Sequence, residues 1–137
     1  MVGVWPEEQH LRALGDEDVR YFMVTRANGE SIGFAMLRGI QSSHRNIELK
    51  RFVIATPGTG LGQQALRAVM RVVFRELQAH RLWLDVFQTN LRAQHVYRKA
   101  GLREEGILRE AIYRDGEFHS LLLMAVLDRE YVSERVP

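Results

Sequence analysis

The segment TPGTGLGQQAL, residues 56–66, places three glycines at alternate positions between an apolar run and a helical pattern. In residues 46–55 before it, apolar and polar residues alternate as in a strand. After it, apolar residues recur every three or four positions from Leu61 to Leu77, as in a helix. The first-turn amides of a helix have no partner within the helix, and the helix dipole adds positive charge there. Glycine lets a ligand approach these amides, so the segment predicts an anion site or, alternatively, only a flexible connection.

The spacing of the glycines argues against two familiar nucleotide motifs. A Walker A loop ends in lysine followed by Ser or Thr, whereas Gln63-Gln64 follows the last glycine here. The dinucleotide-binding fingerprint spaces its last two glycines differently. We therefore expect neither ATP nor NAD at this loop.

The composition is that of one globular domain over residues 1–137, because 46% of the residues are hydrophobic. The net charge is only +2, with no long run of one sign that would indicate nucleic-acid binding. The absence of cysteine excludes a disulfide framework and a catalytic thiol. No apolar stretch approaches the roughly 20 residues of a membrane span, and no signal peptide is recognisable, so we expect a cytoplasmic protein.

The rest of the chain alternates between strand and helix patterns. The turn signals Asn28-Gly29 and Asp115-Gly116 each lie between extended runs and predict two hairpins. Trp5-Pro6, followed by acids, predicts a helix start. A strand over residues 82–88 and a helix from Asn90 to Ala100 complete the pattern. This order predicts a mixed α/β sheet whose central strands are parallel, with a ligand site at the carboxyl end of the first of them.

Two motifs in this order resemble the GNAT family of N-acetyltransferases, in its ribosomal-protein-alanine acetyltransferase branch. They are GTGLG after the strand ELKRFVIA, and NLRAQHVYRKAGL after the next strand, and the resemblance covers residues 46–127. It implies a mostly antiparallel mixed sheet with a central parallel strand pair and flanking helices. Family members usually begin with a strand and a helix for which this chain leaves no room, so we expect that N-terminal strand and helix to be missing.

The resemblance implies that acetyl-CoA is the cosubstrate and that the glycine loop holds its pyrophosphate. Pro57 stands where the family carries Gln or Arg, and proline removes one amide donor. The backbone of the preceding strand would bond the pantetheine arm, while the side chains there can still serve the core. The residues implied for the cofactor in these two segments are Phe52, Val53, Ile54, Gly58, Thr59, Gly60, Leu61, Gly62 and Gln63.

The second helix and the strand before the loop carry the residues implied for the chemistry. Asn90 and Tyr97 share one helix face, and the resemblance assigns Asn90 to the pantetheine amide and Tyr97 to the cofactor sulfur. The alternatives are a simple N-cap and a core aromatic. A base must accept a proton from the acceptor ammonium, and we expect Glu48 to do so directly or through water. The alternative for Glu48 is a surface ion pair with Lys50.

These residues predict an N-acetyltransferase that moves the acetyl group of acetyl-CoA to a primary amine by direct attack. The acceptor would be a protein N-terminus or a small-molecule amine, with neither nucleic acid nor membrane as a partner. An exposed sheet edge would allow a homodimer, and the scattered histidines predict no metal. The alternative is a domain that binds acyl-CoA as a sensor or assembly part without turnover, which would need neither Glu48 nor Tyr97.

Overall fold

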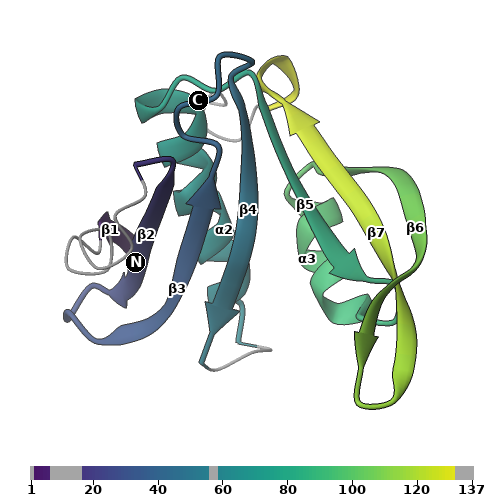
Figure 1. The fold of residues 1–137 in the computed structure, drawn as a ribbon. Helices are drawn as coiled ribbons and strands as arrows, with labels where there is room; N and C mark the ends of the chain where they lie inside the picture. Colours follow the sequence, from purple (N-terminus) through teal and green to yellow (C-terminus); the bar gives the residue numbers. More distant parts are fainter. Residues whose placement is uncertain (1, 7–16, 56–58, 132–137) are drawn as a thin grey trace.

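The computed structural model describes residues 2–6, 17–55 and 59–131. The strands in this part of the chain form one seven-stranded sheet in the order β1-β2-β3-β4-β5-β7-β6 (Figure 1). In chain order they are β1 (Val2–Pro6), β2 (Val19–Arg26), β3 (Ser31–Arg38), β4 (Asn46–Ile54), β5 (Arg81–Phe87), β6 (Arg103–Arg114) and β7 (Glu117–Leu127). The helical elements are α2 (Leu61–Arg71), which continues as the π-helical turn η1 (Val72–Glu76), then α3 (Leu91–Lys99) and the short 3₁₀ turn η2 (Asp128–Glu130).

Neighbouring strands are antiparallel except for the central pair, β4 and β5. A parallel pair needs a crossover connection, and here α2 and η1 supply it. This confirms the mixed, mostly antiparallel sheet with a central parallel pair and flanking helices. The predicted helix after the glycines is confirmed over residues 61–76, although its last part widens into the π-helical turn η1, whose C-cap is Leu77.

The predicted hairpins are confirmed, and their turns explain why the sequence specified them. Asp115 and Gly116 have φ +53° and +79°, which is the left-handed backbone that their two-residue hairpin requires, and Gly29 has φ +88° in the loop of residues 27–30 between β2 and β3. Gly101 has φ +106° just after α3, where a left-handed residue ends a helix. At these turns, local sequence chemistry was enough to place the elements.

Both helices pack against the same face of the sheet. The buried side chains of β5, Leu82, Leu84 and Val86, belong to one apolar cluster with Leu66 of α2 and Tyr97 of α3. In Figure 1, α2 runs behind β2, β3 and β4, and α3 lies beside β5. Gln63 also donates from its Nε2 to the Val96 carbonyl (3.3 Å), so the two helices contact each other directly.

The prediction of a helix start at Trp5-Pro6 was wrong, because these residues end the edge strand β1, which pairs antiparallel with β2. Backbone pairing with β2 prevails over the local helix signal, and proline, which lacks an N–H, is tolerated at the end of an edge strand. Residues 2–6 are therefore the edge strand of the sheet. The acids that followed in the pattern lie outside the described residues.

Candidate active site

The glycine loop leads into the first turn of α2. Gly60 is the N-cap residue with φ +81°, a conformation that residues with a Cβ rarely adopt. A Cβ at Gly60 or at Gly62 would meet no atom of the described residues within 4 Å, so both positions are open toward that part of the structure. The first-turn amides of α2 have no partner within the helix. Gly58 and Pro57 lie outside the described residues.

β4 and β5 pair over three positions only, from Asn46–Arg81 to Glu48–Trp83. Beyond Glu48 they move apart toward their carboxyl ends (Figure 1). A bulge in β4 lies at this point: Leu49 pairs with Leu37 and Arg51 with Met36, which leaves Lys50 as an extra residue. Bulges bend a strand and increase its twist, so the bulge accounts for the separation of β4 from β5. The remainder of β4 therefore has an unpaired edge that faces the gap.

A cavity of about 630 Å³ opens beside this gap, which is within the usual size of small-molecule sites. Residues from β4, the start of α2 and α3 line it. Eight of the predicted site residues are among them: Phe52, Val53, Ile54, Gly60, Gly62, Gln63, Asn90 and Tyr97. Thr59 is exposed and does not line it, and the side chain of Leu61 packs instead against the smaller apolar cluster of Val24, Ile32 and Ala65.

Three basic side chains of α3 also line the cavity, and the sequence analysis did not single them out for this role. They are Arg92, His95 and Lys99, all of them exposed. Their spacing of three and four residues puts them on one helix face, which is the signal that could have revealed them. The cavity thus combines unpaired first-turn amides at one end with the positively charged Arg92 and Lys99 along one wall, a combination suited to phosphate groups.

Asn90 both caps α3 and lines the cavity. Its Oδ1 accepts a hydrogen bond from the Ala93 amide (3.2 Å), as expected of an N-cap. Its Nδ2 makes no hydrogen bond to the described residues. The side chain can therefore keep its structural contact and still donate to a ligand in the cavity.

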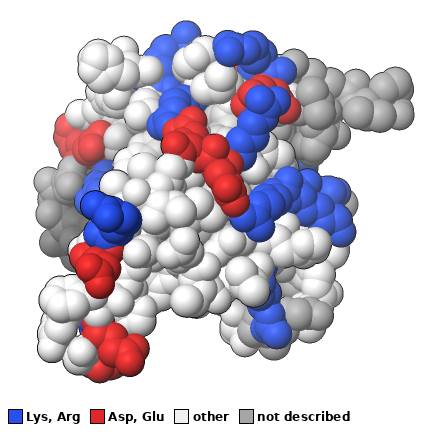
Figure 2. Space-filling view, turned by 90° about the vertical axis from the view of Figure 1, so that its right-hand side faces the viewer, with Lys and Arg blue, Asp and Glu red and all other residues white. Residues whose placement is uncertain are grey.

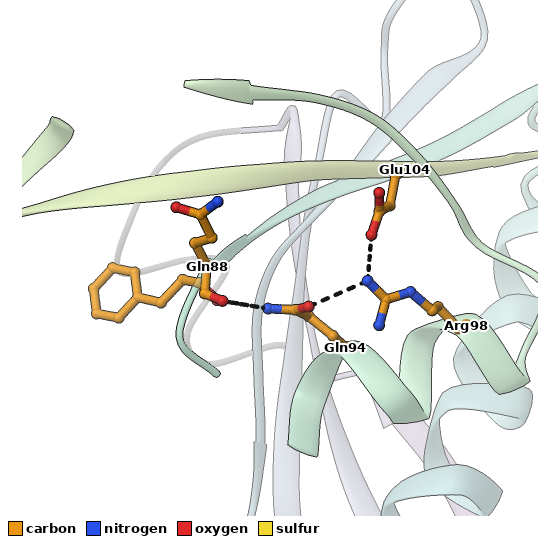
Figure 3. A network of polar contacts seen from close by, with 5 residues as sticks. Gln88, Gln94, Arg98 and Glu104 are labelled. Atoms are coloured by element: carbon orange, nitrogen blue, oxygen red, sulfur yellow. Dashed lines mark hydrogen bonds and ion pairs between the residues drawn. The ribbon is translucent and has the colours of Figure 1, made fainter. Parts of the chain in front are cut away.

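The position of α3 depends on Gln94, a buried polar residue that the sequence analysis missed. Its Nε2 donates to the carbonyls of Phe87 (3.1 Å) and Gln88 (2.9 Å), where β5 ends. Its Oε1 accepts from Arg98, which in turn pairs with Glu104 of β6 (Figure 3). Buried amides are retained where their hydrogen bonds are satisfied, and this network ties α3 to β5 and β6. The network therefore fixes where α3 holds Asn90 and Tyr97 relative to the gap between β4 and β5.

Tyr97 is largely buried, with 9% of its surface exposed, and it lines the cavity from α3. Burial disfavours the phenolate, and the nearby carboxylate of Asp85 disfavours it further, so the pKa of Tyr97 rises to about 12. The hydroxyl consequently stays protonated at physiological pH. It can donate a hydrogen bond to a group in the cavity.

Glu48 is buried, with 4% of its surface exposed, and its partner is Arg38. Nε and Nη2 of Arg38 donate to Oε1 of Glu48 at 3.0 and 2.7 Å. The alternative of a surface ion pair with Lys50 was wrong, because Lys50 is the bulge residue and Arg38 is directly opposite Glu48 on β3. Oε2 of Glu48 accepts no hydrogen bond from the described residues. It can therefore receive one from another molecule.

The charge on the β6–β7 side of the molecule is mixed. Figure 2 shows the side of the molecule that carries β6, β7 and α3, where groups of Lys and Arg lie beside groups of Asp and Glu with uncharged surface between them. Within residues 2–6, 17–55 and 59–131 there is no cluster of three metal-ligating side chains, and no helix there is long and apolar enough to cross a membrane.

The sequence profile of the acetyltransferase (GNAT) domain matches residues 5–103. The chain belongs to the GNAT acetyltransferase family. The chain is 31% identical to spermidine N(1)-acetyltransferase of Escherichia coli (strain K12) over 87% of its residues, and spans 64% of that relative's length. The chain is 26% identical to a candidate ribosomal N-acetyltransferase of Bacillus subtilis (strain 168), over 79% of this chain and 60% of that one.

A solved GNAT structure shares the fold described above. Spermidine N-acetyltransferase from Vibrio cholerae, in complex with CoA and spermine, matches with a TM-score of 0.83 and 29% identity, over 93% of this chain and 76% of that one. The match confirms the predicted GNAT fold for this chain.

Proposed function

We propose that this GNAT domain transfers the acetyl group of acetyl-CoA to a primary amine. The single observation that carries the proposal is the cavity beside the β4–β5 gap, because it brings together loop glycines, the unpaired edge of β4, and Asn90 and Tyr97 of α3. The named activity of the relatives, acetylation of spermidine, supports the same reaction class. We keep the single domain over residues 1–137 and the cytoplasmic location as predictions.

The chain fits acetyl-CoA at three points. Open space at Gly60 and Gly62, together with the first-turn amides of α2, suits a pyrophosphate, and Arg92 and Lys99 supply positive charge beside it. The free edge of β4 at Phe52, Val53 and Ile54 offers backbone groups to the pantetheine amides, as an added strand would use them. Asn90 adds a side-chain amide donor.

Acetyl-CoA supplies an activated thioester, and Tyr97 and Glu48 are the residues proposed to act on its reaction with the amine. Because the pKa of Tyr97 is about 12, full transfer of its proton to a thiolate of pKa ~8.5 would cost about 5 kcal/mol of free energy. We infer that Tyr97 donates a hydrogen bond to the developing charge on sulfur. Glu48 is proposed to accept the amine proton through Oε2, directly or by a water.

The acceptor is proposed to be a small-molecule amine, for which spermidine is the first probe because the relatives are named for it. A protein N-terminus is the second acceptor to test, with an alanine-terminated ribosomal peptide as its probe. A homodimer built on a sheet edge remains a further proposal.

Calorimetric titration with acetyl-CoA, followed by thiol release on addition of spermidine, spermine or the peptide, tests the proposal. We expect binding and amine-dependent thiol release. Tyr97→Phe should reduce kcat about 100-fold while acetyl-CoA binding persists, and Glu48→Gln should reduce the rate most at low pH. Absence of binding would overturn the proposal. Binding without release by any amine, with both variants unchanged, would favour the sensor or assembly module.

A further inference from the structure

β5 carries an acidic side chain, Asp85, on the face of the sheet opposite to α2 and α3. Leu82, Leu84 and Val86 of β5 are buried in the core that the helices cover. Successive side chains of a strand point to opposite faces, so Asp85 lies on the other face. The pairing with β7 agrees, because Asp85 is opposite Leu123, which lies outside the helix-covered core cluster.

Asp85 stands at the edge of the gap between β4 and β5. Glu48 and Trp83 form the last pair of these parallel strands and point to the same face. Asp85 follows Trp83 by two residues, so it shares that face and lies where β4 no longer pairs with β5. The cavity that fits acetyl-CoA opens on the helix side of the gap. With acetyl-CoA in that cavity, the opposite side of the gap, on which Asp85 lies, is left for the acceptor.

The carboxylate of Asp85 makes no ion pair and no side-chain hydrogen bond with the described residues, although the residue is half-buried. Two basic side chains with contacts on that face are engaged elsewhere. Arg38 is bound to Glu48, and the guanidinium of Arg114 lies over the Phe87 ring, 4.8 Å from its centroid. A partly buried carboxylate without a cation is costly, and an ammonium ligand would remove that cost.

Asp85 also acts electrostatically on the residue across the gap. After burial, its negative charge is the second cause of the raised pKa of Tyr97. Tyr97 lines the cavity on the helix side, and Asp85 lies on the opposite face. The two side chains therefore face the same gap from its two sides.

We propose that Asp85 is an acceptor-binding residue, whose carboxylate holds the protonated amine of the acceptor at the β4–β5 gap opposite Tyr97. The inference rests on the proposed acetyltransferase function and names the chemistry of its acceptor, an alkylammonium. Glu48, whose charge Arg38 already balances, keeps the separate role of proton acceptor.

The test is steady-state kinetics of Asp85→Asn with spermidine as the acceptor, beside calorimetric titration of the same protein with acetyl-CoA. We expect the KM for spermidine to rise about 10- to 100-fold, as for the loss of a hydrogen bond to a charged group. We expect the Kd for acetyl-CoA to stay within about twofold of the unchanged protein, because Asp85 does not line the cavity. The spermidine KM of the variant should also depend less on salt than that of the unchanged protein.

Asp85→Glu serves as the conservative variant and should restore part of the acceptor affinity. Glu76→Gln is the matched control, because Glu76 is exposed at the end of η1 and its change removes the same charge away from the gap. An unchanged spermidine KM in Asp85→Asn would overturn the inference, and so would a parallel loss of acetyl-CoA binding, which indicates a structural role. If the unchanged protein acetylates no amine, the proposed function itself fails, which is a separate outcome.

Discussion

Burial and the charge of Asp85 hold the hydroxyl of Tyr97 in its protonated form. The stability of the fold therefore depends on pH at high pH. The folded pKa of about 12 exceeds the unfolded value of about 10, so the folded state binds the proton more tightly. The resulting stabilisation is fully present below pH 10 and is lost as the pH rises through 12. It amounts to about 2.7 kcal/mol at most.

Tyr97→Phe should therefore lose less stability than the unchanged protein between pH 10 and pH 12. Urea unfolding of both proteins at pH 9, 10 and 11 measures this difference. Phenolate absorbance gives an independent reading, since Tyr97 should ionise only near pH 12. Parallel stability curves for the two proteins would contradict the prediction.

Arg38 and Glu48 form a pair in which the two members differ in burial. The Glu48 side chain is 6% exposed and that of Arg38 is 47% exposed. Arg38→Ala leaves a buried carboxylate without its donors and should lower the free energy of unfolding by about 1–3 kcal/mol. Glu48→Gln keeps an oxygen that accepts from Arg38 and should cost less. Chemical denaturation of both variants checks this order, and a greater loss in Glu48→Gln would refute it.

At the scale of elements, helix stability and acetyl-CoA binding favour different residues at position 62, in the first turn of α2. Glycine in a helix is less stable than alanine by about 0.5–1 kcal/mol, and a methyl group at Gly62 would clash with no atom of the described residues. Gly62→Ala should therefore stabilise the fold. The same methyl group would fill the space assigned to the pyrophosphate, so the affinity for acetyl-CoA should fall about tenfold, by on the order of 1.4 kcal/mol.

Thermal unfolding and calorimetric titration of Gly62→Ala measure these two opposite effects. Gly106→Ala is the matched control, because Gly106 lies in β6, away from the cavity, and also has open space at its Cβ. Unchanged acetyl-CoA affinity in Gly62→Ala would show that the pyrophosphate does not lie against this turn.

At the scale of the whole molecule, the sheet consists of two parts, β1–β4 and β5–β7, joined by three paired positions. A ligand in the cavity contacts both parts and binds only the folded chain. Acetyl-CoA at 100 times its Kd should thus stabilise the protein by about 2.7 kcal/mol, which raises Tm on the order of 10 °C. Thermal denaturation with and without acetyl-CoA tests this, and an unchanged Tm would mean that the cavity does not take the cofactor.

Much of the fold followed from local backbone chemistry. Left-handed glycines at Gly29, Gly101 and Gly116 mark turns and a helix end because few other residues adopt that conformation. The apolar periodicity of residues 61–77 indicated the crossover helix, and the strand-glycine-helix order indicated where a ligand would bind. The helix signal at Trp5-Pro6 failed because pairing with Met23 and Phe22 of β2, which are distant along the chain, outweighed it.

The sequence by itself indicated the mixed sheet, the order of its elements and the glycine loop, and it placed Asn90 and Tyr97 on one face of a helix, because each of these follows from patterns close along the chain. Only the tertiary structure decided that Arg38 balances Glu48, that Gln94 anchors α3, and that Asp85 faces the gap. These contacts depend on strand register and on the bulge at Lys50, which shifts every later side chain of β4 by one place. Register is set by the packing of the whole sheet, and no short pattern encodes it.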